Sequence, residues 1–415
     1  MTVELDDGSI KSYWNTKVKK NLAINKTEKK YNHFIKIITH NYGIALSLIV
    51  IVGVFQFMTE GMFLGPTNLI KLITQNSYIV ILALGMLLVI VSGNLDLSSG
   101  AVIGFTGALA AIFIVNLHMN WIFVSLLCIC AGALIGGIQG YLIAFYKIPA
   151  FIVTLAGMLV CSGLTNILLH GQTLGPFPQG LQRFSSGFVP EIFVYPDLHL
   201  TSMIIGTAFA CIRLYLKFRM RFKQARLGLK IEPFYFFLIK NFYFFCLIIY
   251  FNLVLSSYKG IPNVLVIVMG LILIYSFIAN RTVLGRSVYA VGGNSEAARL
   301  SGIKTQWINC FVFVNMGALA ALAGLIFAAH QNMATVKAGV GFELDAAAAC
   351  FIGGTAATGG VGKIIGAVIG TCVIGVMNNG MDFMGVNNNY QQIIKGIVLI
   401  AAVLLDVIKK NKFSS

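Results

Sequence analysis

The chain contains about twelve apolar runs, and most of them are long enough to cross a membrane as an α-helix. The runs lie near residues 42–58, 72–92, 101–116, 121–145, 150–169, 201–216, 234–255, 264–279, 308–329, 344–358, 364–381 and 391–408. A helix needs roughly 20 apolar residues to cross a hydrocarbon core about 30 Å thick. Of the 415 residues, 58% are apolar and 11% are charged, against roughly 25% charged in soluble domains. The sequence therefore predicts an all-α polytopic membrane protein with about 10–12 transmembrane helices.

The formal charge of +16 is concentrated between the apolar runs, in segments 11–36, 213–230, 281–304 and 409–412. Positive residues gather on the cytoplasmic side of membrane proteins. Both termini and the gaps 213–230 and 280–307 are therefore expected in the cytoplasm of a bacterial cell, and the charge gives no reason to expect a nucleic-acid partner. Two runs are weak: 201–216 runs into Arg213, and 344–358 is short and rich in Gly and Ala. Either is compatible with a half-crossing segment.

The organisation along the chain follows from the same pattern. Residues 1–40 are polar and lysine-rich and form a cytoplasmic N-terminal extension, whereas 41–411 form one transmembrane domain. Several glycines are spaced four residues apart, which lets helix backbones approach closely in lipid. These are Gly100 and Gly104, the series Gly132, Gly136 and Gly140, and the pair Gly366 and Gly370.

A short internal similarity suggests an inverted repeat. Leu95, Asp96, Ile103, Gly104 and Thr106 match Leu344, Asp345, Ile352, Gly353 and Thr355 without a gap. By the crossing count, the first copy starts inside and the second outside, as inverted repeats of transporters do. Chance similarity between two segments rich in Gly and Ala is the alternative.

Two aspartates interrupt the apolar pattern. Asp96 lies in the motif Asn94–Gly100 between two runs, where a carboxylate at the bilayer centre would cost roughly 2.5–3.5 kcal/mol. One interpretation is that Asp96 caps a helix beginning at Leu97. A compatible one is that the break lines a substrate path at the end of a half-helix. Asp345 carries the same two interpretations.

The candidate path residues are the polar ones at these breaks and in the nearby apolar runs. They can line a wet path or hydrogen-bond between helices. They are Asn94, Asp96, Ser98, Ser99, Thr106, Asp345, Asn378 and Asn379.

The segment Gly292–Ile303 predicts a short helix in a cytoplasmic gap. Asn294 or Ser295 would cap it, Glu296 lies in its first turn and Gly302 ends it. Such an element can dock in a groove of another protein, or it can be an ordinary solvated loop helix.

Catalytic and nucleotide sites are not predicted. The stretch Ala357–Ile364 lacks the first Gly of a phosphate loop and the Ser or Thr after Lys363. The six histidines are isolated, and the eight cysteines form no Cys-x-x-Cys pair. We therefore expect no metal site, no cofactor and no catalytic residues in this chain.

Several motifs together resemble the permeases of monosaccharide ABC importers. They are Gly292–Ile303, Asn94–Gly100, Ile352–Thr355 with Gly359–Gly362, Asn378–Met381 and Gln392–Gly396. Within that family the chain looks most like the D-xylose type, because of Pro149–Met158 and an extra helical stretch at 201–258. The resemblance covers roughly residues 45–408.

The resemblance implies a transport subunit rather than an enzyme. It implies a cytoplasmic ABC ATPase that binds the ATP and Mg, an external sugar-binding protein, a second permease copy, surrounding membrane lipid and a monosaccharide substrate, with D-xylose or another pentose or hexose as the best match. It also implies that 280–307 is a cytoplasmic coupling loop whose contacts with the ATPase come from Asn294, Glu296, Ala297, Ala298, Arg299 and Gly302.

The main rival is an ion-coupled secondary carrier of a small polar solute. Such carriers use intramembrane charges as relays, and few besides Asp96, Asp345, Asp382 and Lys395 are present. A membrane-embedded enzyme is a further alternative, without a visible active site.

Overall fold

The structure is a computed structural model that describes residues 46–192, 199–229 and 231–414. Its contacts divide the chain into two units, Met1–Val50 and Ile51–Ser415. The predicted extension 1–40 lies outside the described residues. An apolar helix, Leu46–Met58, begins the described part of the chain.

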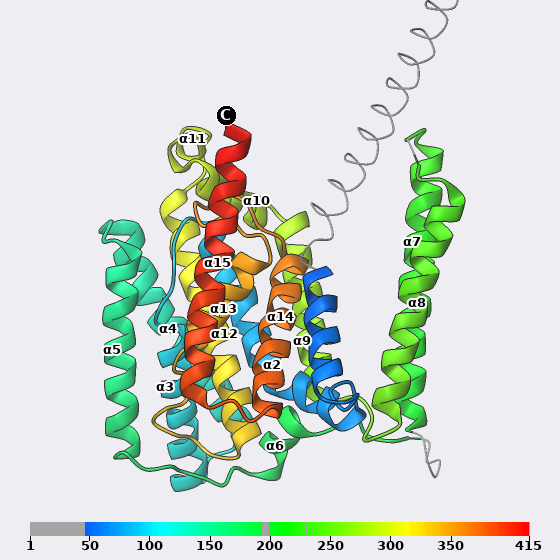
Figure 1. Cartoon of the computed structure of the whole chain (residues 1–415). Coiled ribbons are helices and arrows are strands. Elements are labelled where there is room, and N and C mark those ends of the chain that lie inside the picture. Colours follow the sequence, from blue (N-terminus) through cyan, green and yellow to red (C-terminus); the bar gives the residue numbers. More distant parts are fainter. Residues whose placement is uncertain (1–45, 193–198, 230, 415) are drawn as a thin grey trace, which may run out of the picture. The chain divides into compact units, whose positions relative to one another are not determined.

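The described residues are almost entirely helical (Figure 1). The elements after Leu46–Met58 are α2 (Pro66–Val91), α3 (Ser99–Ala111), the π-helix η1 (Ile112–Asn116), α4 (Trp121–Phe145), α5 (Ala150–Leu169), α6 (Gln179–Ser186), α7 (Leu200–Arg226), α8 (Phe234–Ser256), α9 (Asn263–Arg281), α10 (Val283–Gly293), α11 (Ser295–Leu300), α12 (Thr305–Gln331), α13 (Phe342–Ile352), α14 (Ile364–Phe383) and α15 (Asn388–Ser414). Nine helical segments in the described ranges are long and apolar enough to cross a membrane. The prediction of an all-α polytopic membrane protein is confirmed.

Helix starts follow local sequence signals. Helix α2 begins with Pro66, whose missing N–H would be unpaired at this position in any case. Asn120 caps α4 by accepting a hydrogen bond from Ile122 N at 2.9 Å. Thr282 caps α10 in the same way, accepting from Gly285 N at 3.1 Å.

Helix α2 forms the centre of the second unit. Its second half, from Ile79 to Val91, is apolar on every side and buried throughout. A helix that is hydrophobic all round belongs in a protein interior or a membrane. Here α9, α10, α12, α13 and α14 all pack against it, whereas α4, α5, α7, α8 and α9 leave most of their apolar surface exposed, as lipid-facing helices do.

Glycines set the closest helix contacts, as predicted. On α4, a Cβ at Gly136 would lie 2.1 Å from Phe313 O of α12, and one at Gly132 would lie 2.4 Å from Gly317 O. On α14, a Cβ at Gly370 would lie 1.9 Å from Ala349 O of α13. A methyl group at any of these positions would push two backbones apart, so the prediction of tight packing is confirmed.

Two non-helical segments, made largely of turns, each lead into a short helix. Residues 92–98 precede α3, and residues 332–341 precede α13. Helix α3 begins at Ser99, two residues later than expected, but Asp96 does accept the hydrogen bond from Ser98 N that was expected of a cap at this N-terminus. Asp345 instead lies within the first turns of α13. The aligned aspartates thus occupy different positions relative to their helix starts, and the inverted repeat stays a prediction.

The stretch 201–258 forms an antiparallel hairpin of α7 and α8. Helix α7 continues unbroken through Arg213. A Cβ at Gly206 would lie 2.2 Å from the Asn252 side chain, whose Nδ2 donates to Met203 O at 3.0 Å. These contacts hold the two helices together at the end where the hairpin leaves the rest of the chain.

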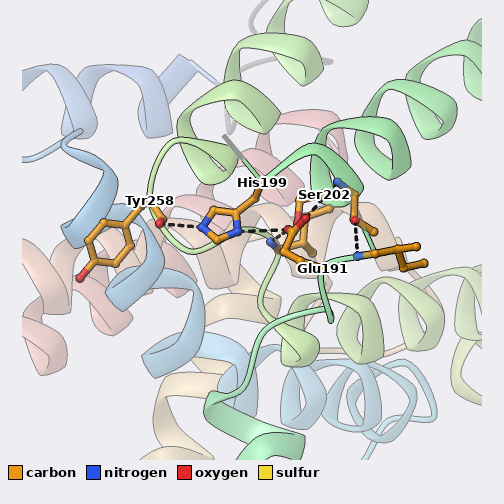
Figure 2. A network of polar contacts seen from close by, with 7 residues as sticks. Glu191, His199, Ser202 and Tyr258 are labelled. Atoms are coloured by element: carbon orange, nitrogen blue, oxygen red, sulfur yellow. Dashed lines mark hydrogen bonds and ion pairs between the residues drawn. The ribbon is translucent and has the colours of Figure 1, made fainter. Parts of the chain in front are cut away.

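A polar cluster that we call the clasp fixes that end (Figure 2). His199 Nδ1 lies 3.1 Å from Glu191 Oε1, and His199 Nε2 lies 3.0 Å from Tyr258 O. The Ser202 hydroxyl accepts a hydrogen bond from Ile261 N at 3.0 Å. The clasp therefore ties together the segment before α7, the start of α7 and the α8–α9 connection.

Candidate functional site

A cavity of about 310 Å³, which we call the first cavity, opens among α2, α12, α13, α14 and α15. Its volume is at the lower end of the range for small-molecule sites. Its wall is rich in amide, carboxylate and aromatic side chains: Gln75, Asn76, Tyr78, Ile79, Phe327, His330, Gln331, Phe342, Asp345, Asn378, Asn379, Asp382, Gln391 and Lys395. Three of the predicted path residues, Asp345, Asn378 and Asn379, are among them.

A charged pair lies in this wall. Lys395 Nζ donates to Asp345 Oδ2 at 2.9 Å, and the Asp345 side chain is 6% exposed against 29% for Lys395. Asn378 Nδ2 donates to the same oxygen at 3.4 Å. The buried carboxylate is thus neutralised by a lysine whose other donors remain accessible from the cavity.

Three aromatic rings form another part of the wall. Tyr78 stacks on Phe342 with ring centroids 4.6 Å apart, and Phe327 meets both rings edge-on at 5.1 and 5.2 Å. Carboxylates, amides and lysine exchange hydrogen bonds with hydroxyl groups, while ring faces offer apolar contact. The first cavity therefore suits a small solute that carries many hydroxyls.

A second cavity, of about 370 Å³, lies at the other end of α2 and α13. Its lining includes Asn94, a predicted path residue, along with Ile90, Gly93, Leu95, Ala150, Phe151, Phe351 and Ala357. On α2, Ile79 faces the first cavity and Ile90 the second, which separates them by about 16 Å along the helix. Helix α13 likewise presents Phe342 to one cavity and Phe351 to the other.

The first turn of α3 meets the segment before α13 backbone to backbone. A Cβ at Gly100 would lie 2.3 Å from Gly339 O, and a Cβ at Gly339 would lie 2.1 Å from Gly100 O. Gly339 also has φ +80°, a conformation that favours glycine. No side chain fits between the start of α3 and the segment before α13.

A third acid, Glu343, lies at this contact and was not among the predicted residues. It is buried, and its Oε2 would be 2.0 Å from a Cβ at Gly100. The sequence could have indicated this residue, because Glu343 is an acid within an apolar stretch, two residues before Asp345.

Asp96 organises the turn ahead of α3. It is 3% exposed, and its Oδ1 accepts hydrogen bonds from Ser98 N at 2.8 Å and Ser98 Oγ at 2.6 Å. Ser98 Oγ also lies 3.0 Å from Gln139 Oε1 on α4, and Gly157 on α5 leaves space for that glutamine. Asp96 and Ser98 therefore link α3 to its neighbours rather than lining either cavity.

The two remaining path residues are buried in helix packing. Thr106 is fully buried and donates to Val102 O of its own helix at 2.8 Å. The Ser99 side chain is also buried, with an Oγ that has no hydrogen-bond partner among the described residues. Neither residue lines a cavity.

The predicted short helix of the coupling loop is present as α11. Asn294 caps it by accepting from Ala297 N at 2.9 Å, and Gly302 with φ +85° follows its end. Glu296 and Arg299 form an exposed ion pair on one face. Ala297 is exposed, whereas Ala298 is buried against the chain itself, so only the first can approach a partner.

The coupling loop packs directly on the end of α2. A Cβ at Gly292 would lie 1.6 Å from Val91 O, and Gly360 N donates to the same carbonyl at 2.8 Å. Tyr289 supports this joint by donating to Gly362 O at 2.9 Å, and burial raises the pKa of its phenol, which keeps the donor protonated. The segment that contains α10 and α11 is therefore in direct backbone contact with the end of α2, beside the second cavity.

Comparison with known proteins gives the family. Residues 68–403 match the model described as branched-chain amino acid transport system / permease component. The chain belongs to this permease family. Its relatives include sugar permeases, so the resemblance stated from the sequence is confirmed.

Two kinds of sugar permease illustrate the similarity. The xylose transport system permease protein XylH of Escherichia coli K12 is 34% identical over 366 residues, which cover 88% of this chain and 91% of that protein. The Haemophilus influenzae protein of the same name is 35% identical over 380 residues, covering 89% and 97%. The ribose import permease protein RbsC of E. coli K12 is 31% identical over 362 residues, covering 87% and 92%. No solved structure matches the chain.

Proposed function

We propose that the chain is the membrane-spanning permease subunit of an ABC importer that carries a monosaccharide, D-xylose or another pentose or hexose, across the cell membrane. The observation that carries the proposal is the pair of cavities at opposite ends of α2 and α13, together with the backbone contact between the first turn of α3 and the segment before α13. Alternating access requires a solute site that is reached from one side at a time. The first cavity has the hydroxyl-binding groups that a sugar needs.

The same proposal assigns a partner to each end of the permease. The exposed face of α11, with Ala297, the Glu296–Arg299 pair and a Leu300 that is 79% exposed, would receive the cytoplasmic ATPase, which binds the ATP and Mg. The first cavity would then face the external sugar-binding protein. The basic segments between the apolar runs favour this orientation, because positive residues gather on the cytoplasmic side. A second copy of the permease completes the importer.

Reconstitution tests the proposal. The permease is incorporated into proteoliposomes with the ATPase and the sugar-binding protein encoded beside it, and uptake of labelled D-xylose, D-ribose and D-glucose is measured. We expect uptake of at least one of these sugars that stops when the phosphate-loop lysine of the ATPase is replaced. Uptake that follows an imposed ion gradient and ignores ATP would instead identify a secondary carrier.

A further inference from the structure

We propose that the α7–α8 hairpin binds the phosphate headgroups of anionic membrane lipids at the end remote from the clasp. We call this end, which comprises Arg213–Arg226 of α7 and Phe234–Lys240 of α8, the basic end. The proposal rests on the hairpin spanning the membrane, and it is independent of which solute the permease carries.

The basic end has far more cations than the chain itself neutralises. Between residues 213 and 240 the sequence contains eight lysines and arginines and a single acid, Glu232. The Glu232 carboxylate pairs with Lys240 at 3.8 Å, which is the one ion pair among the described residues of the hairpin. Four of the other cations, Lys217, Arg219, Lys223 and Arg226, have exposed side chains. Clusters of this size beside a membrane span attract anionic lipids.

The apolar part of α7 is shorter than a bilayer core. From Leu200, α7 rises about 20 Å before it reaches Arg213. A hydrocarbon core is about 30 Å thick. Such a mismatch is relieved by thinning the bilayer and by long basic side chains reaching to the headgroups. Both effects bring lipid phosphates to these cations.

Aromatic rings hold two of the arginines in place. The Arg213 guanidinium lies 4.8 Å from the centroid of the Phe244 ring, and Arg221 lies 4.7 Å from Phe237 and 5.5 Å from Phe234. Contact with a ring face uses the flat side of the guanidinium and leaves its N–H edge for an acceptor. Arg221 Nη1 is buried and has no acceptor among the described residues. The neighbouring Arg219 and Arg226 have exposed side chains, which can form the short charge-assisted bonds that arginine makes with phosphate.

The surroundings favour a lipid over a soluble anion. The start of α8 exposes large aromatic side chains at the same level as the cations, including Tyr235 at 79% and Phe236 at 70%. Aromatic side chains with basic neighbours are typical of the membrane interface. A phospholipid satisfies both groups at once, because its phosphate meets the arginines while its chains cover the rings.

Lipid preference in a bilayer tests the proposal. The permease is reconstituted in phosphatidylcholine vesicles with spin-labelled phosphatidylglycerol or spin-labelled phosphatidylcholine, and electron paramagnetic resonance gives the association of each with the protein. We expect a preference for phosphatidylglycerol that weakens as salt is raised. In R219Q/R221Q/R226Q the preference should fall by about fivefold or more, because each cation near an anionic surface contributes separately.

Two further variants separate charge from packing. R219K/R221K/R226K keeps the charge and should keep most of the preference, even if the ring contacts weaken. K71Q/K259Q/K337Q removes three exposed lysines outside the basic end, so its net charge changes equally, and it should behave as wild type. The proposal is overturned if the glutamine triple variant keeps the wild-type preference, if the K71Q/K259Q/K337Q control loses as much, or if inorganic phosphate displaces the labelled phosphatidylglycerol.

Discussion

The Lys395 ammonium lies 2.9 Å from the Asp345 carboxylate in the wall of the first cavity. The two residues come from different helices, α15 and α13, and the carboxylate is the more deeply buried partner. Neutralising Asp345 alone leaves the Lys395 ammonium without its counter-charge. A partly buried cation that loses its charged partner lowers the stability of the protein, whereas removal of both charges is often tolerated.

We therefore expect Asp345→Asn to lower the free energy of unfolding by about 1–3 kcal/mol and to reduce sugar uptake. Adding Lys395→Met should restore most of the stability but not the uptake. Denaturant unfolding in detergent and uptake in proteoliposomes measure the two effects. Glu232→Gln is the control, since its exposed pair with Lys240 contributes at most about 1 kcal/mol. An Asp345→Asn protein as stable and active as wild type would show that the pair is dispensable.

The stacked rings of Tyr78 and Phe342 give the second prediction. If the ring face contacts the sugar, Tyr78→Phe should transport normally. Tyr78→Ala, which loses a stacking contact of about 0.5–1.5 kcal/mol besides the contact with the sugar, should reduce the maximal uptake rate by about fivefold or more. Initial uptake rates at saturating loaded binding protein measure this difference. Equal rates for both variants would show that the Tyr78 ring does not contact the transported sugar.

Neighbouring alanines on α11 give the third prediction. Ala297 is exposed and Ala298 is buried, so a tryptophan at each site has a different effect. Ala297→Trp should insert and purify normally but abolish sugar-stimulated ATP hydrolysis and uptake, because bulk separates the permease from the ATPase. Ala298→Trp should instead lower the yield of folded permease.

A smaller loss of coupling should follow Arg299→Ala, since an exposed ion pair contributes roughly 0–1 kcal/mol. Assembly, ATPase rate and uptake are compared for all three proteins. If ATP hydrolysis and uptake remain fully coupled in Ala297→Trp, α11 is a solvated loop helix that does not contact the ATPase.

The fourth prediction compares two adjacent glycines. A Cβ at Gly292 would lie 1.6 Å from the Val91 carbonyl, whereas one at Gly293 has nothing within 4 Å. Backbone cannot rotate away as a side chain can, so Gly292→Ala should cost about 1–3 kcal/mol of stability. It should also uncouple ATP hydrolysis from uptake by displacing the coupling loop from α2. Gly293→Ala is the matched control and should match wild type. Equal thermal unfolding of the two variants would contradict the tight joint.

The fifth prediction concerns orientation. Gln179 begins α6 and Lys223 lies near the end of α7, and both are exposed. In a background without the native cysteines, Gln179→Cys should react with an impermeant thiol reagent in intact cells, and Lys223→Cys should react only after the cells are opened. The reverse labelling pattern would invert the proposed topology.

Helix positions could be predicted from the sequence because a bilayer demands long apolar runs. The first residue of α3 could not, since the turn in which Asp96 bonds to both the N–H and the hydroxyl of Ser98 delays the helix to Ser99. Lys395 and Asp345 are distant in the chain, and no local pattern predicts that they pair. Thr106 was assigned to the path on polarity alone, yet its hydroxyl satisfies a carbonyl of its own helix. Polarity therefore predicts which residues need a partner, and only the packing decides what that partner is.

The contact between Gly100 and Gly339 also bears on how well the membrane stays electrically insulated. A closure made by side chains alone can open when a rotamer changes, which takes picoseconds to nanoseconds at exposed positions. A contact between two peptide backbones that leaves no room for a methyl group on either glycine opens only when whole segments separate, and such movements take microseconds or longer. A permease sealed in this way would preserve the proton-motive force of its cell between transport cycles.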